Sequence, residues 1–459
     1  MGMRERYEMV NLVDLRMMAK NRGIKSVTTM NKEKLIEAML QKDEEDALAK
    51  EVVKEEVKEP AKESVKEPEE TKPEAEKAKE DCDMSIDSGI TVTGILEIMQ
   101  DGFGFIRSAN FLPGENDIYV SPVQIRKLGL RTGDIITGNT RIKTEREKFA
   151  ALLYITKLNG YPVAEGQKRY NFEKMTPIFP NERILLERKG EISMRIMDLV
   201  CPVGKGQRGM IVSPPKAGKT TLLKSVAKSI KHSNPDMHMI ILLIDERPEE
   251  VTDIKEEVEG PNVEVIYSTF DETAEHHKRV AEMVIERARR MVEYKKDVVI
   301  LLDSITRLTR AYNQVVQPSG RTLSGGLDPA ALHMPKRFFG AARNMREGGS
   351  LTILATALVE TGSKMDDVVY EEFKGTGNME MVLDRKLSER RVFPAIDLMK
   401  SSTRKEDLLL QKDELVVMNA IRKKFNGLRP EDQADMVVEM FKNTDTNAEF
   451  VRQAEKRFL

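Results

Sequence analysis

The chain has 459 residues, 40% of them hydrophobic, which is enough for two or three domains with buried cores. Its formal net charge is -2, but residues 42–83 hold nine lysines against 17 acidic residues, which leaves about +6 on the remainder and permits a polyanionic partner. Only two cysteines are present, no signal-peptide pattern opens the chain, and no window approaches the roughly 20 apolar residues of a membrane span. These features exclude a disulfide scaffold and favour a cytoplasmic protein without a membrane segment.

Residues 1–41 are predicted to form a small helical domain. Leu12, Leu15 and Ala19 share one helical face, and Gly23 ends that helix. A second helix begins after Asn31, which is expected to cap it.

Residues 42–88 are predicted to be a charged, disordered linker. Within them the four-residue repeat "VKEE VKEP AKES VKEP" is interrupted by Pro60 and Pro68, and its charges cannot bury apolar area. A charged helical stalk is the alternative.

Residues 89–158 alternate short strand-like runs with glycine, asparagine or aspartate. The runs are "ITVTGILEIM", "GFGFIRS", "NDIYVSP", "GDIITGNTRI" and "FAALLYITKL". This spacing predicts a five-stranded β-barrel of the OB type, followed by a connector over residues 159–194.

From residue 195 to 459, continuous apolar strands alternate with helices. The strands are predicted in "GMIVS", "MHMIILLID", "NVEVIYST", "DVVILLD" and "SLTILATAL". Such an order predicts a parallel sheet covered on both faces, with the chemistry at the carboxyl ends of its strands.

The segment "IVSPPKAGKTTLL", residues 211–223, has the strand, loop and helix order of a phosphate-binding loop. Ser213 occupies the place of the first glycine in that pattern, but the N–H groups that would bind β- and γ-phosphates lie downstream, from Lys216 to Thr220. Lys219 is expected to contact phosphate and Thr220 to bind magnesium. An ordinary helix start is the alternative.

Two predicted strands end in carboxylates near that loop. Asp303 would hold magnesium beside Thr220, and Glu246 would act as the general base that activates the attacking water. Arg247 could reach the γ-phosphate or pair on the surface with Glu249 or Glu250.

The barrel segment "DGFGFIRS" places Phe103 and Phe105 on one strand face, with Arg107 two residues further on, and Tyr119 adds a third ring. Such a face suits stacking of bases and contact with phosphate in single-stranded nucleic acid, although alternating rings also form cores. The intervening glycines suggest that something flat approaches the backbone.

Two loops of the ATPase half, residues 317–328 and 360–367, are polar and carry basic residues, so they are either mobile or in contact with a substrate. The adjacent His276 and His277 point about 100° apart on a helix and offer no zinc geometry, so they are expected on the surface.

Long strings of this sequence resemble the bacterial transcription termination factor Rho family, whose members are ring-shaped hexameric RNA-dependent ATPases and helicases. The strings include "DGFGFIRS", "DIYVSP", "PPKAGKT", "LLIDERPEEVTD", "ILLDSITRL", "ALVETGSKMDD" and "RRVFPAID", and the likeness covers nearly all of residues 89–459. It implies a RecA-like ATPase core with a parallel sheet, preceded by an OB-fold barrel and a small helical unit.

The resemblance also implies roles for individual residues. The primary RNA site would comprise Phe103, Phe105, Arg107, Asp117, Tyr119, Glu147 and Phe149. ATP would be bound by Lys216, Ala217, Gly218, Lys219, Thr220, Thr221, Arg391 and Phe393, with Mg²⁺ on Thr220 and Asp303. Catalysis would use Glu246, Lys219, Arg247 and, from the neighbouring subunit, Arg404. Arg321, Thr322, Gly362, Ser363 and Lys364 would grip RNA in the central channel.

The mechanism so implied is sequential ATP hydrolysis between the subunits of a homohexamer, which pulls cytosine-rich single-stranded RNA 5′ to 3′ and dislodges RNA polymerase. A rotary ATP synthase subunit or a RecA-like strand-exchange protein shares the ATPase core, but neither calls for the Phe103–Phe105 face. An RNA-binding regulator with a vestigial ATPase is the other alternative, against which Lys219, Glu246 and Asp303 argue.

Overall fold

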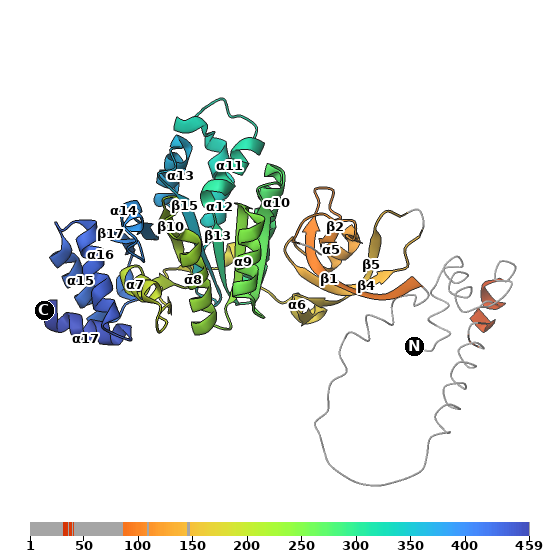
Figure 1. Cartoon of the computed structure of the whole chain (residues 1–459). Helices are drawn as coiled ribbons and strands as arrows, with labels where there is room; N and C mark the ends of the chain where they lie inside the picture. Colours follow the sequence, from red (N-terminus) through yellow and green to blue (C-terminus); the bar gives the residue numbers. More distant parts are fainter. Residues whose placement is uncertain are drawn as a thin grey trace, which may run out of the picture. The chain divides into compact units, whose positions relative to one another are not determined.

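The computed structural model describes residues 31–34, 36–38, 40, 86–107, 110–144 and 147–458 (Figure 1). The rest of the predicted helical domain and nearly all of the linker, with Cys82, lie outside these residues. The predicted cap is confirmed, because the Lys34 N–H donates to Asn31 Oδ1 at 3.1 Å. No helix of the described residues is long and apolar enough to span a membrane.

The predicted five-stranded barrel is confirmed. Its strands are β1 (Asp87–Ile98), β2 (Gly104–Arg107), β3 (Ile118–Val120), β4 (Ile135–Arg141) and β5 (Ala150–Leu158). They pair in the order β3-β2-β1-β4-β5, and a parallel β3–β5 pairing closes the barrel. Side chains that point inward from each of the five strands fill it, among them Leu96, Ile106, Val120, Ile136 and Leu158.

One helix of the barrel, α5 (Pro122–Leu128), was not predicted. It begins after Ser121, whose hydroxyl accepts the Gln124 N–H at 3.3 Å, while the Gln124 side chain returns to the Ser121 backbone. This capping box stabilises a helix of only two turns.

The segment from 159 to 194 joins the barrel to the ATPase half through short elements. These are β6 (Tyr161–Pro162), α6 (Val163–Gly166), η2 (Phe172–Lys174), β7 (Pro177–Ile178), β8 (Arg183–Ile184) and the start of α7 (Ile192–Val200). Strand β7 pairs with β14 and β8 pairs with β9 (Val203–Gly204), so the segment is hydrogen-bonded to the ATPase half.

The second sheet is largely parallel, as predicted. Its strands are β10 (Arg208–Ser213), β11 (His238–Glu246), β12 (Val263–Thr269), β13 (Asp297–Asp303), β14 (Arg343–Met345), β15 (Ser350–Leu358), β16 (Met379–Leu383) and β17 (Ile396–Thr403). The main order is β12-β11-β13-β15-β10-β16-β17, in which only β17 is antiparallel to its neighbour. Strand β14 pairs antiparallel with β15 beside this path.

Helices cover both faces of this sheet (Figure 1). One face packs against α7, α8 (Lys219–Ser233) and α9 (Pro248–Val258), and the other against α10 (Ala274–Glu293), α11 (Ile305–Val315), α12 (Pro329–Phe339) and α13 (Lys364–Lys374). Successive residues of β11 alternate between the two cores, since Met239 and Ile241 join the first and Ile240 and Leu242 the second.

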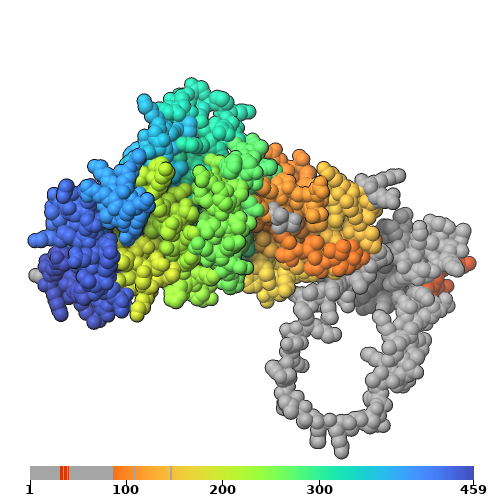
Figure 2. Space-filling view, in the orientation of Figure 1, coloured from red at the N-terminus to blue at the C-terminus, as the bar shows by residue number. Residues whose placement is uncertain are grey.

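The remaining elements complete the ATPase half. They are η3 (Ser324–Gly326), α14 (Arg385–Glu389), η4 (Glu406–Leu408), α15 (Lys412–Phe425), α16 (Pro430–Lys442) and α17 (Asn447–Phe458). The barrel, orange to yellow, is in direct contact with the green segment that contains α10 (Figure 2).

Candidate functional site

The phosphate-binding loop connects the end of β10 to the start of α8, as predicted. Ser213 is the last, fully buried residue of β10, and the positive backbone angles come later, with φ of 63° at Lys216 and 88° at Gly218. Serine therefore replaces the first glycine of the pattern without strain, because the position needs no left-handed backbone.

Two cavities border this loop. A polar one of about 580 Å³ is lined by Lys219 and Thr220, and by Glu246 and Arg247. An apolar one of about 520 Å³ is lined by Ala217, Leu222, Leu383, Phe393 and Pro394. Three loop residues, Lys216, Gly218 and Thr221, line both. The pair can receive a molecule with a charged end and a flat apolar end, such as a nucleotide.

Lys219 and the two predicted carboxylates meet in the polar cavity. The ammonium Nζ lies 2.5 Å from Asp303 Oδ1 and 3.2 Å from Glu246 Oε1. The Thr356 hydroxyl on β15 donates to the same Asp303 oxygen at 2.7 Å. The strand ends thus bring together a cation and two acids that lie far apart in the sequence.

Burial and charge shift the protonation of this cluster in a definite direction. Burial raises the pKa of Glu246, and the neighbouring Asp303 raises it further, while Lys219 and Arg307 partly offset the rise. Burial alone would lower the pKa of Lys219, but the Asp303 and Glu246 carboxylates outweigh it and raise that pKa. Lys219 therefore stays charged, and Glu246 becomes a stronger base than an exposed glutamate.

Sequence reasoning missed Arg307, in the first turn of α11. Its guanidinium lies 3.6 Å from Asp245 Oδ2 and 3.6 Å from Glu246 Oε2, and it lines the polar cavity. The signal was available, because Arg307 follows Asp303 by four residues at the carboxyl edge of the sheet. Arg247 is exposed at the N-cap of α9 and also lines this cavity.

The other residues predicted to act on the nucleotide lie in two separate places. Phe393 lies in the apolar cavity with its ring about half exposed, and Arg391 is an exposed residue with φ of 63°. Arg404 follows Thr403, which pairs with Met379, and Met379 pairs with Gly209 at the start of β10. Arg404 is therefore at the amino edge of the sheet, opposite the phosphate-binding loop.

The predicted aromatic face of the barrel is present, and Phe149, which the resemblance implied for the same site, is its fourth ring. Phe103 and Phe105 have ring centroids 5.7 Å apart, Tyr119 lies 5.8 Å from Phe103, and Phe149 lies 5.1 Å from Phe105. All four side chains are partly exposed, whereas Leu96 and the other barrel core residues point inward. These rings are a surface cluster rather than the core.

The expected phosphate contact of Arg107 is not available in this arrangement. Its side chain is 4% exposed, its Nε donates to Glu97 at 2.8 Å, and it pairs with the buried Asp117 while lying over the Phe105 ring. Arg107 and Asp117 therefore form a buried ion pair that packs against the Phe105 ring. Glu147 pairs with Arg141 and accepts the Thr144 N–H, a bond that lowers the pKa of Glu147.

The prediction that a flat ligand explains the glycine spacers is wrong for Gly104. A β-carbon there would lie 2.8 Å from Leu96 Cδ1 and 3.0 Å from the Glu97 carbonyl oxygen. Packing inside the barrel therefore requires this glycine.

The two polar loops of the ATPase half lie against each other. Gly325 has φ of 78°, and a β-carbon on it would lie 2.7 Å from the Lys364 carbonyl carbon. Lys364, Gly362, Arg321 and Thr322 are exposed at these loops, and Ser363 is the N-cap of α13.

The prediction that both adjacent histidines are on the surface is wrong for His277. It is 6% exposed, its Nδ1 lies 2.7 Å from the Ser268 hydroxyl, and burial lowers its pKa. It faces the core because its place on α10 turns it toward β12. Among the described residues no group of three or more His, Cys, Asp or Glu side chains could hold a metal.

Two family models match the two structural halves. Residues 193–403 match the nucleotide-binding domain of the ATP synthase alpha/beta family, and residues 92–164 match the RNA-binding domain of the Rho termination factor. The fold and the sites thus define the chain as an ATPase of the ATP synthase type joined to an RNA-binding barrel.

Curated relatives identify the family more closely. The chain is 57% identical to transcription termination factor Rho of Bacillus subtilis over 78% of this chain and 83% of that protein. It is 56% identical to the Pseudomonas aeruginosa factor over 79% of this chain and 87% of that protein. The chain belongs to the transcription termination factor Rho family.

Solved structures agree on the fold. An ATPase of a bacterial type III secretion system superimposes with a TM-score of 0.53 at 20% identity, covering 70% of this chain and 94% of the other. The assembled ATPase EscN of enteropathogenic E. coli gives 0.52 at 20% identity, covering 70% and 79%. At this identity the likeness shows the fold alone.

Proposed function

We propose that the chain is an RNA-dependent ATPase that moves along cytosine-rich RNA 5′ to 3′ as a ring of six copies and releases transcripts from RNA polymerase. The observation that carries the proposal is the cluster of Lys219, Glu246 and Asp303 at a phosphate-binding loop, in the same chain as a surface of four aromatic rings. Membership of the Rho family supports the assignment of this pair of sites to transcription termination.

In the hydrolytic site, Lys219 would turn from the two carboxylates to the β- and γ-phosphates of ATP. Glu246 would accept a proton from the attacking water, a role that its raised pKa suits because the base must bind that proton in the transition state. The adenine would occupy the apolar cavity against Phe393, with Arg391 nearby. Arg247 would approach the γ-phosphate from the rim of the polar cavity.

The residues present fit magnesium. Asp303 Oδ2 is buried and accepts no hydrogen bond in the described structure, while Thr220 lines the same polar cavity at the second position of α8. Thr220 and Asp303 would hold the ion, which neutralises phosphate charge when bound. The ion would then join Lys219 and Thr356 as a partner of Asp303.

On the barrel, the rings would stack on successive bases of a single strand. Base–aromatic stacking contributes about 1–3 kcal/mol per base, so four clustered rings can hold a short segment without help from the ATPase half. The exposed residues Arg321, Thr322 and Lys364, with Gly362 and Ser363, would contact RNA from the two adjoining loops.

Arg404 would complete the hydrolytic site of a neighbouring copy. Within one chain it is at the opposite sheet edge from Lys219, so it supports a role in trans rather than in its own site. An arginine supplied in trans makes hydrolysis depend on assembly, because the charge of the transition state is otherwise unbalanced.

The decisive measurement is ATP turnover with poly(C), with poly(dC) and without polymer. We expect strong stimulation by poly(C) alone, and no turnover for Lys219→Ala under any condition. Lys219→Ala should still bind a cytosine oligonucleotide through the barrel, which separates the two sites. Equal stimulation by poly(dC), or loss of RNA binding together with turnover, would count against the proposal.

A further inference from the structure

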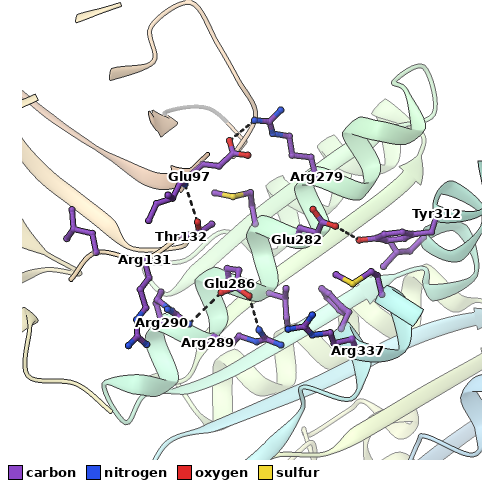
Figure 3. A pocket seen from close by; sticks show the side chains of 17 residues that line it. Glu97, Arg131, Thr132, Arg279, Glu282, Glu286, Arg289, Arg290, Tyr312 and Arg337 are labelled. Carbon is purple, nitrogen blue, oxygen red and sulfur yellow. Dashed lines mark hydrogen bonds and ion pairs between the residues drawn. The ribbon is translucent and has the colours of Figure 1, made fainter. Parts of the chain in front are cut away.

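A cavity of about 730 Å³ lies where the barrel meets the ATPase half, apart from the nucleotide site (Figure 3). The barrel contributes Glu97 and the stretch from Leu130 to Thr132, while α10, α11 and α12 contribute the other walls. Its volume is in the range of ligand-binding clefts.

The lining of this cavity is rich in arginine. It contains five arginines against three glutamates, an excess of two positive charges. Figure 3 shows the guanidinium groups of Arg131, Arg290, Arg289 and Arg337 along one side, with Arg279 across from them. The arginines come from the barrel, α10 and α12, so a ligand on them would touch both halves of the chain.

Several of these N–H groups have no acceptor. The Nε atoms of Arg279, Arg289 and Arg290 are buried without a hydrogen bond, and the exposed Arg337 has no carboxylate within ion-pair distance among the described residues. Burial lowers the pKa of Arg290, which means that Glu293 and Glu286 do not fully compensate its charge. The exposed Arg337 guanidinium is open to a ligand with anionic oxygens, and the three enclosed Nε groups add uncompensated positive charge beside it.

The cavity shares a wall with the aromatic face of the barrel. Glu97 is paired with Phe105 in the β1–β2 register, and its Oε2 accepts from Arg107 at 2.8 Å and from Arg279 at 2.7 Å. A strand stacked on Phe105 therefore needs to continue only past Glu97 to reach the arginines.

We propose that this cavity is a second contact of the RNA strand on the same chain, where arginines bind backbone phosphates next to the bases held by the barrel. The inference rests on the proposed RNA-binding function. A strand fits better than a free nucleotide, because the two rings of the cavity, Tyr312 and Phe338, are each 6% exposed and offer no stacking surface for a base. The described lining thus offers charged groups to a phosphate backbone and no exposed aromatic ring to a base.

The test compares a cytosine dinucleotide, which the aromatic face can hold alone, with a cytosine octanucleotide that extends beyond it. Binding is measured against salt for the full chain and for Arg337→Gln, with Arg337→Lys as the charge-retaining variant and Arg452→Gln, an exposed arginine of α17, as control. All proteins also carry Lys364→Ala, so that the contribution of Lys364 to RNA binding is removed equally from each.

For Arg337→Gln we expect the octanucleotide to bind about 3- to 10-fold more weakly at low salt and its salt slope to fall by about 0.7, the value for one phosphate contact on a single strand. Dinucleotide binding should not change, and Arg337→Lys should keep the slope. An unchanged octanucleotide slope would overturn the inference, as would equal loss for both lengths. An Arg337-dependent affinity for CTP but not for RNA would overturn it too, in favour of a small-anion site. If the chain that carries only Lys364→Ala binds neither RNA, and the unaltered chain measured beside it binds neither as well, the proposed function itself fails.

Discussion

At the scale of single residues, a one-residue irregularity selects which of two adjacent acids enters the hydrolytic site. Strand β11 ends in Asp245 and Glu246, and the pairing with β12 passes from Ile244 to Glu246 and leaves Asp245 out. Asp245 has φ of 59°, and its side chain is 38% exposed against 4% for Glu246. The bulge therefore returns Glu246 to the lining of the polar cavity and leaves Asp245 outside that lining, beside Arg307.

Arg307 should set the pH at which this base works. Its positive charge favours ionised Glu246, so its removal should raise the pKa of Glu246 further and move the acidic limb of the kcat–pH profile to higher pH. The measurement is RNA-stimulated turnover of Arg307→Ala across pH. Arg307→Lys keeps the charge, so the acidic limb of its kcat–pH profile should stay close to that of the unaltered chain. If Arg307→Ala instead lowers kcat by the same factor at every pH, Arg307 does not set the pKa of Glu246.

The sequence allowed the residues of the hydrolytic site to be predicted only where a local motif carries the chemistry. Lys219 and Thr220 follow from the loop pattern, and Glu246 and Asp303 follow from the ends of apolar strands. Arg307 could have been found from its spacing to Asp303, but Thr356 was missed because its contact with Asp303 depends on how β15 packs beside β13. His277 was placed wrongly for the same reason.

At the scale of elements, α11 touches both the hydrolytic site and the two polar loops. Besides Arg307 at its start, Arg310 donates at 2.6 Å to Asp366, which lies in the first turn of α13 at the end of the predicted 360–367 loop. Asn313 Oδ1 accepts the Asp328 N–H of the 317–328 loop at 2.8 Å. One rigid helix therefore contacts the site of hydrolysis and the loops expected to hold RNA.

Replacing Gly325 should separate those loops. In Gly325→Ala the new β-carbon would collide with the backbone at Lys364, so we expect RNA-stimulated turnover to fall several-fold while basal turnover and the thermal midpoint stay close to those of the unaltered chain. Gly320→Ala is the matched control, since its φ of 77° imposes similar strain but its β-carbon meets open space. If both variants lose the same activity, the contact between the loops has no part in stimulation.

Strands were predicted better than short helices. The buried strands β11 and β13 are continuous apolar runs between polar ends, and their period is visible in the sequence itself. Helix α5 spans only seven residues, too few to show a helical period, so it could have been found only from its cap, Ser121 with Gln124 three residues later.

At the scale of the whole molecule, the two halves of the described chain meet around one buried carboxylate. Glu293 at the end of α10 is 1% exposed, lies 2.9 Å from Arg131 of the barrel and 3.5 Å from Arg169, and accepts the Phe172 N–H at 3.1 Å. Loss of such a buried partner leaves its arginines uncompensated. The barrel is therefore anchored to the ATPase half by charge as well as by backbone.

Activity should depend on assembly. Turnover per chain should fall when the unaltered protein is diluted below the concentration at which it assembles, and Arg404→Ala should lower kcat by roughly 10³-fold while nucleotide binding is kept. Analytical ultracentrifugation run beside the turnover assay identifies the assembled species. Single chains that hydrolyse ATP as fast as assemblies would refute a contribution in trans.

The position of Arg404 also bears on the symmetry of an active assembly. The arginine and the phosphate-binding loop are at opposite edges of one sheet, so the surface that would give the arginine differs from the surface that would receive it. Where each copy gives its arginine to one neighbour and receives one from another, the contact is head-to-tail. Repeating such a contact yields either a closed circle or an endless helix, and the angle between neighbours decides between them.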